Sequence, residues 1–218
     1  GGAQKGNPCQ VAGEVMIPGL LSLAAIAPNP TPLQSALIKV SFDQDAIAPE
    51  KGDKVAVLTT TEGKIVVMFF PQVAPNHVKN FQELAEKSFY NGTRFHRCIP
   101  GFMIQGGDPN SADLARSNFW GTGGPMDSEG KRIGVNAEFS ELKHNRGILS
   151  MARAQDPNSA GSQFFIMHAN APFLDGKYSA FGKVIEGLDV VDKIVKTGPT
   201  SQQANGLVPP EKAIVLQT

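Results

Sequence analysis

The sequence predicts a mainly β protein, a closed antiparallel β-barrel capped by two α-helices and preceded by an N-terminal extension. Short strand-like stretches follow one another along most of the chain, and only two stretches have helical periodicity. The 23 glycines and 16 prolines among the 218 residues suit the many tight turns that such strands need. Closure into a barrel removes the exposed edges of a sheet, and a chain of this length has room for one core and an appendage.

Composition and charge exclude several classes of protein. Lys plus Arg number 20 and Asp plus Glu number 20, so no net charge favours nucleic acid or an anionic membrane as a partner. The four histidines show no ligand spacing and the two cysteines form no CxxC pair, so no metal and no cofactor are predicted. Cys98 is expected to be a small buried residue, and a single disulfide between Cys9 and Cys98 is an open alternative.

Residues 1–52 are predicted to be a Pro-rich extension. Their apolar run, over 15–27, is thirteen residues long and is broken by a Pro-Gly pair, so it is too short to span a bilayer. The run lacks the positively charged start of a signal peptide, although residues 25–27 look like a cleavage site. The compartment therefore stays open, with export favoured slightly over the cytoplasm. Residues 36–42 are predicted to add one strand.

From residue 53 the pattern sharpens into the elements of a barrel domain over 53–218. Residues 55–60 and 65–70 flank a short turn and predict a hairpin. Residues 74–88 predict a helix that plugs one end of the barrel, because a proline falls in the first turn and apolar residues follow at helical spacing. This apolar stripe consists of Val78, Phe81, Leu84 and Ala85. His77 lies off the stripe and is expected to be solvated.

The stretch from Phe95 to Asp108 alternates apolar and polar residues around a Pro-Gly turn, which predicts a hairpin or a kinked pair of strands. Period-two alternation places Arg97 on the same face as Phe95, and Gln105 on the same face as Met103. A guanidinium and a carboxamide would then stand beside apolar surface. The pattern by itself favours a half-buried strand whose Arg and Gln are solvated, so a functional interpretation needs further motifs.

The second half of the chain begins with a long polar loop over 108–137, and loops of that length are usually functional or flexible. Its Trp120 is expected to pack the loop down rather than to contact substrate. Strands are then predicted over 148–151, 163–167 and 180–185, a second short helix over 188–195, and a final strand over 213–216.

Several motifs in a fixed order give the chain a close resemblance to a known family. They are Phe95 to Asp108, Gly121-Thr122-Gly123-Gly124, Gly147 to Ala154, Gly161 to Ile166, Phe173 to Lys177, and Phe181 to Val184. Together they resemble the cyclophilin family of peptidyl-prolyl cis-trans isomerases, in its bacterial type, over about residues 54–216. The resemblance implies eight strands, an interior filled by side chains and an active face on the outside of the barrel.

The resemblance implies an enzyme that isomerises X-Pro bonds and acts on proline-containing peptides and unfolded proteins. Its catalytic residues are implied to be Arg97, Gln105 and Phe102. The residues implied to bind substrate are Met103, Thr122, Ala152, Arg153, Ala154, Gln163, Phe165, Phe173, Leu174 and Tyr178. Rotation about an X-Pro bond breaks amide resonance, a barrier of ~18–20 kcal/mol, and needs a pocket and a donor rather than a nucleophile.

Two positions depart from the best-known eukaryotic pattern of the family, and a third differs from a residue that is frequent there. Phe173 stands where a tryptophan is usual and Tyr178 where a histidine is usual, as in bacterial-type members. The missing indole N–H implies that cyclosporin binds weakly at best. Arg153 stands where an asparagine is frequent, and its longer cationic side chain is expected to alter the preference for residues before the proline.

The alternative function is a module of the same fold that binds proline peptides without turnover. Such a module is expected to lack the arginine or the pocket phenylalanine, whereas this chain keeps the whole set of Arg97, Phe102, Met103, Gln105 and Phe165. A hydrolase is not indicated, because no Ser-His-Asp grouping is suggested. Occupation of the pocket by the Pro-rich extension, as a pseudo-substrate, is an alternative to its packing along the barrel or fraying.

Overall fold

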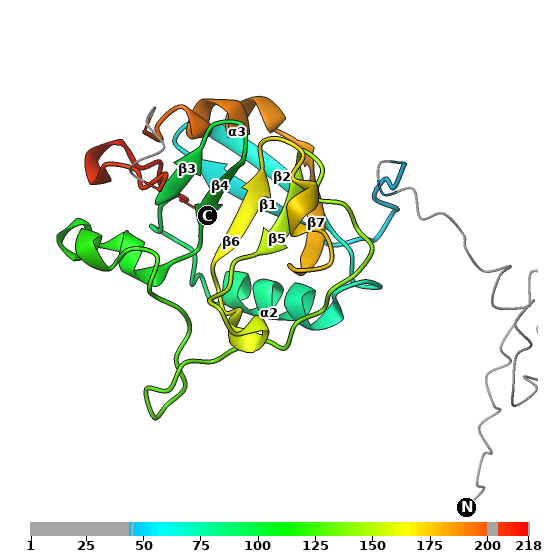
Figure 1. The fold of residues 1–218 in the computed structure, drawn as a ribbon, viewed down its shortest axis with the longest axis horizontal. Coiled ribbons are helices and arrows are strands. Elements are labelled where there is room, and N and C mark those ends of the chain that lie inside the picture. The colour runs from blue at the N-terminus through cyan, green and yellow to red at the C-terminus, as the bar shows by residue number, and fades with distance from the viewer. Residues whose placement is uncertain (1–43, 45, 200–204, 218) are drawn as a thin grey trace, which may run out of the picture. The chain divides into compact units, whose positions relative to one another are not determined.

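A computed structural model describes residues 44, 46–199 and 205–217 of the chain (Figure 1). Its main feature is one antiparallel sheet of seven strands in the order β1-β2-β7-β5-β6-β4-β3. The strands are β1 Val55–Thr60, β2 Gly63–Phe69, β3 Arg97–Ile99, β4 Met103–Gly106, β5 Ile148–Met151, β6 Phe164–Met167 and β7 Ala180–Glu186. Figure 1 shows the sheet curled between helices α2 (Pro75–Glu86) and α3 (Leu188–Val195), which confirms the predicted fold class.

The barrel is completed by the C-terminal segment, which takes the place of the predicted final strand. Leu216 bridges to Thr60 at the end of β1, and Val215 bridges to Arg94 just before β3. The carbonyl of Leu216 accepts from the N–H of Gly92, and the N–H of Leu216 donates to the carbonyl of Thr93, both at 2.8 Å. Isolated bridges therefore join the two edges of the seven-stranded sheet, where a regular eighth strand was expected.

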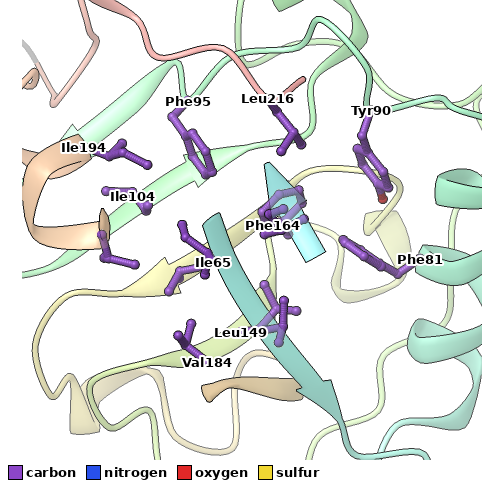
Figure 2. Close-up of a cluster of buried hydrophobic side chains, with 14 of the residues drawn as sticks. Ile65, Phe81, Tyr90, Phe95, Ile104, Leu149, Phe164, Val184, Ile194 and Leu216 are labelled. Carbon is purple, nitrogen blue, oxygen red and sulfur yellow. The ribbon is translucent and has the colours of Figure 1, made fainter. Parts of the chain in front are cut away.

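The interior of the barrel is filled by apolar side chains from most of its elements, as Figure 2 shows. Phe81 of α2 lies 4.9 Å from the ring of Tyr90 and 5.4 Å from that of Phe164 on β6. Three residues of the predicted helical stripe, Val78, Phe81 and Leu84, are buried against the barrel, whereas the fourth, Ala85, is exposed. Cys98 is also buried in this core and carries a free thiol, while Cys9 lies outside the described residues.

His77 corrects one prediction, because its side chain is fully buried rather than solvated. The Nδ1 atom of its ring lies 2.6 Å from the carboxylate of Glu138, which also accepts the main-chain N–H groups of Asn76 and His77 at 3.0 Å. His77 stands one helical turn before Phe81 and its ring lies 6.5 Å from that of Phe181, so it shares the buried side of the helix. Glu138, from a loop distant in sequence, supplies the carboxylate that caps the first turn.

The long polar loop contains two 3-10 helices, Pro109–Ala112 and Leu114–Phe119, which the sequence did not predict. Each begins at an aspartate, Asp108 or Asp113, whose side chain accepts from the main-chain N–H two residues further on. Trp120 ends the second helix and is buried, with its indole N–H donating to two main-chain carbonyls of the loop at 3.1 and 3.2 Å. The prediction that Trp120 packs the loop down is thus confirmed.

Residues 43–218 form one compact unit. Within it, the side-chain amide of Gln44 donates to the carbonyl of Lys143 at 2.9 Å and accepts from its N–H at 2.7 Å. The predicted strand over 36–42 and most of the extension lie outside the described residues, so the boundary at residue 52 and the self-contact stay predictions. In the part of the chain that the structure describes, every helix is too short or too polar to cross a membrane.

Candidate active site

Three neighbouring strands place a guanidinium, a carboxamide and an aromatic ring side by side on the outer face of the sheet. Arg97 on β3 pairs with Gln105 on β4, and Gln105 pairs with Phe165 on β6. The predicted match of faces holds for Gln105 and Met103, but Phe95 is buried in the barrel interior while Arg97 lies outside. The alternation fails there because residues 95 and 96 precede β3 and are not part of a regular strand.

A chain of hydrogen bonds fixes the arginine. Arg97 Nη1 donates to Gln105 Oε1 at 3.2 Å, Gln105 Nε2 donates to Gln163 Oε1 at 3.0 Å, and Gln163 Nε2 donates to the carbonyl of Gly123 at 2.9 Å. A guanidinium only donates and a main-chain carbonyl only accepts, so the orientation of both amides between them is determined. Arg97 Nε also donates to the carbonyl of Asn205 at 2.7 Å, which holds the guanidinium from a second side.

The charged guanidinium of Arg97 is half-buried. Burial lowers the pKa of its guanidinium below the ordinary value, and nearby Tyr178 offsets part of this effect. An arginine nevertheless stays protonated at any working pH. Because the group is partly removed from water, its field on a neighbouring ligand is stronger than that of a fully solvated arginine.

The guanidinium lies at the edge of a cavity of about 410 Å³, a size typical of ligand sites. Its lining consists of Arg97, Phe102, Met103, Gln105, Ala152, Arg153, Phe165, Phe173, Leu174 and Tyr178, all of them among the predicted site residues. Met103, Phe165 and Leu174 are buried and form firm walls. The ring of Phe173 is 60% exposed and lies 5.4 Å from that of Phe102 at the rim.

A second cavity of about 200 Å³ adjoins the first, because Gln105, Ala152 and Arg153 line both. It also contains Ala154 and Gln163, two more of the predicted residues. Thr122 was predicted to bind substrate but lines neither cavity. Its carbonyl accepts a hydrogen bond from the guanidinium of Arg132. Gly121, Gly123, Gly124, Gly161 and Ser162 also line the smaller cavity and belong to motifs that the sequence singled out, whereas Arg132 and Ser159 were not indicated by the sequence.

Beneath the larger cavity lies a Ser-His-Asp grouping that the sequence did not suggest. His144 Nδ1 is 3.2 Å from Asp175 Oδ1, and His144 Nε2 is 3.0 Å from Ser150 Oγ. Ser150 is fully buried and lines neither cavity, so its hydroxyl does not reach a ligand as a nucleophile would. The ring of His144 stacks on Phe165 at 6.2 Å, and the grouping therefore supports the pocket from below.

The two titratable members of this grouping hold one another in place. Burial lowers the pKa of His144, and the hydrogen bond that its ring donates to Asp175 only partly opposes that effect, so the ring is neutral at pH 7. Partial burial raises the pKa of Asp175, but hydrogen bonds from the main chain and ring of His144 outweigh it and leave the value lowered. A neutral ring under an apolar pocket adds no charge beneath Phe165.

Fold and site together define a class of protein: a helix-capped antiparallel β-barrel with a cavity on its outer face and a fixed guanidinium at the rim of that cavity. Residues 55–217 match the family model described as "Cyclophilin type peptidyl-prolyl cis-trans isomerase/CLD". The chain belongs to this family, and peptidyl-prolyl cis-trans isomerase activity follows for it by homology. The predicted family and activity are thereby confirmed.

The chain is similar to bacterial and eukaryotic relatives. A relative from Brucella abortus, named "Probable peptidyl-prolyl cis-trans isomerase", is 42% identical over 169 residues, which are 74% of this chain and 81% of the relative. A solved Cryptosporidium parvum cyclophilin is 34% identical with a TM-score of 0.63, over 76% of this chain and 94% of that one. The same protein in the presence of the dipeptide Ala-Pro has a TM-score of 0.60, over 76% of this chain and 99% of that one.

Proposed function

We propose that Arg97 is the catalytic residue of this isomerase and that the cavity of about 410 Å³ holds the prolyl ring of the substrate. The observation that supports this assignment best is the fixed position of the guanidinium at the rim of an apolar cavity. Three firmly buried side chains, Met103, Phe165 and Leu174, offer the ring an apolar surface. Gln105 holds the guanidinium toward the opening by its hydrogen bond at 3.2 Å.

Catalysis by this site needs no covalent step. When the X-Pro bond twists, resonance is lost and the imide nitrogen regains its lone pair. A donor that meets this nitrogen binds the twisted state more tightly than either planar state, which lowers the barrier. The guanidinium of Arg97 carries several N–H groups in a rigid fork, so it can donate to the nitrogen and to the prolyl carbonyl together.

We further propose that proline-containing peptides and unfolded proteins are the substrates. Phe102 and Phe173 form the outer rim and bound the opening without closing it, since Phe173 is largely exposed. Main-chain pairing with residues 152 and 153 would orient the peptide without selecting its sequence. The Cryptosporidium cyclophilin that was solved in the presence of Ala-Pro supports a small residue before the proline.

The test compares Arg97→Ala with the natural chain on an Ala-Pro peptide by NMR exchange. We expect kcat/KM to fall at least about tenfold, equivalent to ~1.4 kcal/mol of lost transition-state stabilisation, because the donor is removed while the pocket stays. Lys79→Ala, on the exposed side of α2, serves as the control and should leave kcat/KM unchanged. Circular dichroism checks that both variants fold. An Arg97→Ala protein with the full kcat/KM would favour a binding module and refute the assignment.

A further inference from the structure

Three arginines line the two adjoining cavities, and no aspartate or glutamate lines either one. Arg97 belongs to the larger cavity, Arg132 to the smaller one and Arg153 to both. The whole chain has a formal net charge of zero, so this is a local excess of positive charge. We infer that the site selects peptides with an acidic side chain within three residues before the proline, an inference that rests on the proposed function.

Arg153 is held as a fixed charge between the cavities. Its guanidinium carbon lies 4.6 Å from the centre of the Tyr178 ring. Its N–H groups donate to the carbonyls of Lys177, Ala154 and Gln155 at distances between 2.9 and 3.3 Å. All of these partners are neutral, so they position the charge without cancelling it.

Arg132 has donors left for a ligand. Its two terminal nitrogens donate to the carbonyls of Thr122 and Gly123 in the wall of the smaller cavity. A guanidinium has five N–H groups, so these two bonds leave three for a carboxylate, which arginine binds in a paired geometry. Arg132 is exposed, whereas Arg97 and Arg153 are half-buried, so its side chain is accessible to an incoming peptide.

An arginine outside the two cavities is paired with a carboxylate, whereas the three arginines that line them are not. Arg146, which lines neither cavity, donates to Asp192 and forms an ion pair at 2.8 Å. Among the residues that the structure describes, Arg97, Arg132 and Arg153 take part in no such pair. One carboxylate lies behind the wall of the smaller cavity: Asp108 is buried and accepts the N–H of Gly121 at 2.5 Å and of Gly123 at 3.1 Å. These bonds satisfy its oxygens, and one buried charge does not balance three arginines.

The expected effect is modest and sensitive to salt. Unit charges about 4 Å apart attract by about 1 kcal/mol in water, which corresponds to roughly a fivefold change in binding. The screening length is about 10 Å at 0.1 M salt, which is longer than this separation, and about 3 Å at 1 M, so only the higher salt concentration should remove most of the attraction. A Glu-containing peptide should therefore exceed its Gln counterpart in kcat/KM by at least roughly threefold at low salt.

The experiment uses three peptides that differ only in the residue two positions before the proline: Glu, Gln or Lys. NMR exchange gives kcat/KM, and NMR titration of the same samples gives Kd, so the preference is measured even if turnover is absent. We expect the order Glu, Gln, Lys in both quantities, with ratios that approach one at 1 M salt. Arg132→Gln and Arg153→Gln should each lower the Glu-to-Gln ratio. The control Lys79→Gln removes the same unit of charge from α2 and should leave the ratio unchanged.

The outcomes separate the two proposals. Loss of turnover on every peptide would contradict the proposed function, while unequal Kd values in the expected order would still support acidic selection. Equal kcat/KM and equal Kd for the Glu and Gln peptides would overturn the selection and leave the isomerase assignment intact. A preference that persists at 1 M salt, or that neither arginine variant reduces, would also overturn it, because its cause could not be these charges.

Discussion

At the scale of single residues, the two ends of the hydrogen-bond chain in the site fix the direction of every bond between them. Arg97 can only donate and the carbonyl of Gly123 can only accept, so the two glutamine amides between them have one arrangement in which every partner is satisfied. A buried amide left without a partner would cost about 1–3 kcal/mol. The guanidinium is therefore prepositioned before any peptide binds, which is the condition for electrostatic catalysis.

Phe173 gives a prediction at the same scale. Phe173→Trp should strengthen inhibition by cyclosporin, because the larger ring adds apolar area at the exposed rim and its indole N–H supplies a donor that phenylalanine lacks. The measurement is the inhibition constant of both proteins in the same isomerase assay. Phe139→Trp, at another exposed phenylalanine outside both cavities, is the matched control and should not change it. Equal inhibition of the natural chain and Phe173→Trp would show that position 173 does not limit binding.

At the scale of elements, those with a strong local pattern were predicted well. Helix α2 was predicted over 74–88 and runs over Pro75–Glu86, since a proline starts it and its apolar stripe meets the core. The short 3-10 helices of the polar loop were missed, because each depends on one aspartate side chain rather than on periodicity. His77 was misjudged because the partner of its ring, Glu138, lies 61 residues away in sequence.

Glu138 gives a prediction for the link between the loop and helix α2. Its carboxylate accepts three hydrogen bonds at the first turn, from Asn76 N–H, His77 N–H and the His77 ring. Glu138→Gln should lower the free energy of unfolding by about 1–3 kcal/mol, because charge-assisted bonds are lost. Urea unfolding measures this change. Glu141→Gln, on an exposed glutamate of the same loop, is the control and should have an effect within about 0.5 kcal/mol.

The effect of Glu138 should also depend on pH. Partial burial raises its pKa, but hydrogen bonds from His77 and Asn76 outweigh this and leave the pKa lowered in the folded protein. A lowered folded pKa means that the carboxylate stabilises the fold above the ordinary glutamate value of about 4.3 and loses this contribution as pH falls through the folded pKa. The natural chain and Glu138→Gln should thus begin to converge in stability once the pH falls below about 4.3, and should converge further until the pH has passed the lowered folded pKa. A difference that stays constant from pH 7 to pH 3 would contradict this account.

At the scale of the whole molecule, most of the predicted site residues lie around one cavity, but several residues next to them were not predicted from the sequence. Ten of the predicted residues line one cavity. Arg97, Met103, Gln105 and Phe165 lie on adjacent strands whose register brings them side by side, and the other six lie in the segments that join or follow the strands. Arg132 was missed, since it stands in a loop without a periodic pattern, and only the folded chain places it at the smaller cavity. The grouping of Ser150, His144 and Asp175 was missed because only the folded chain brings its members together: 31 residues separate the histidine from the aspartate.

Closure of the barrel is a property of the whole chain, because its last residues join strands from the first half. Leu216 is 2% exposed and packs in the barrel interior, while its main chain pairs with both edges of the sheet (Figure 2). Leu216→Ala should therefore lower the free energy of unfolding by about 2–5 kcal/mol through the cavity it leaves. Leu207→Ala, at a leucine that is 51% exposed, is the matched control and should cost no more than about 0.5 kcal/mol.

Deletion of residues 213–218 should have a second consequence that Leu216→Ala lacks. The truncation also removes the hydrogen bonds to Thr59 and to the stretch before β3, and so leaves two strand edges with unpaired N–H and C=O groups. Such edges pair with other chains, so we expect the truncated protein to associate in light scattering while Leu216→Ala stays monomeric. Urea unfolding should show the truncation to be the less stable of the two. A truncated protein that remained monomeric and as stable as Leu216→Ala would mean that the bridges contribute nothing beyond the leucine side chain.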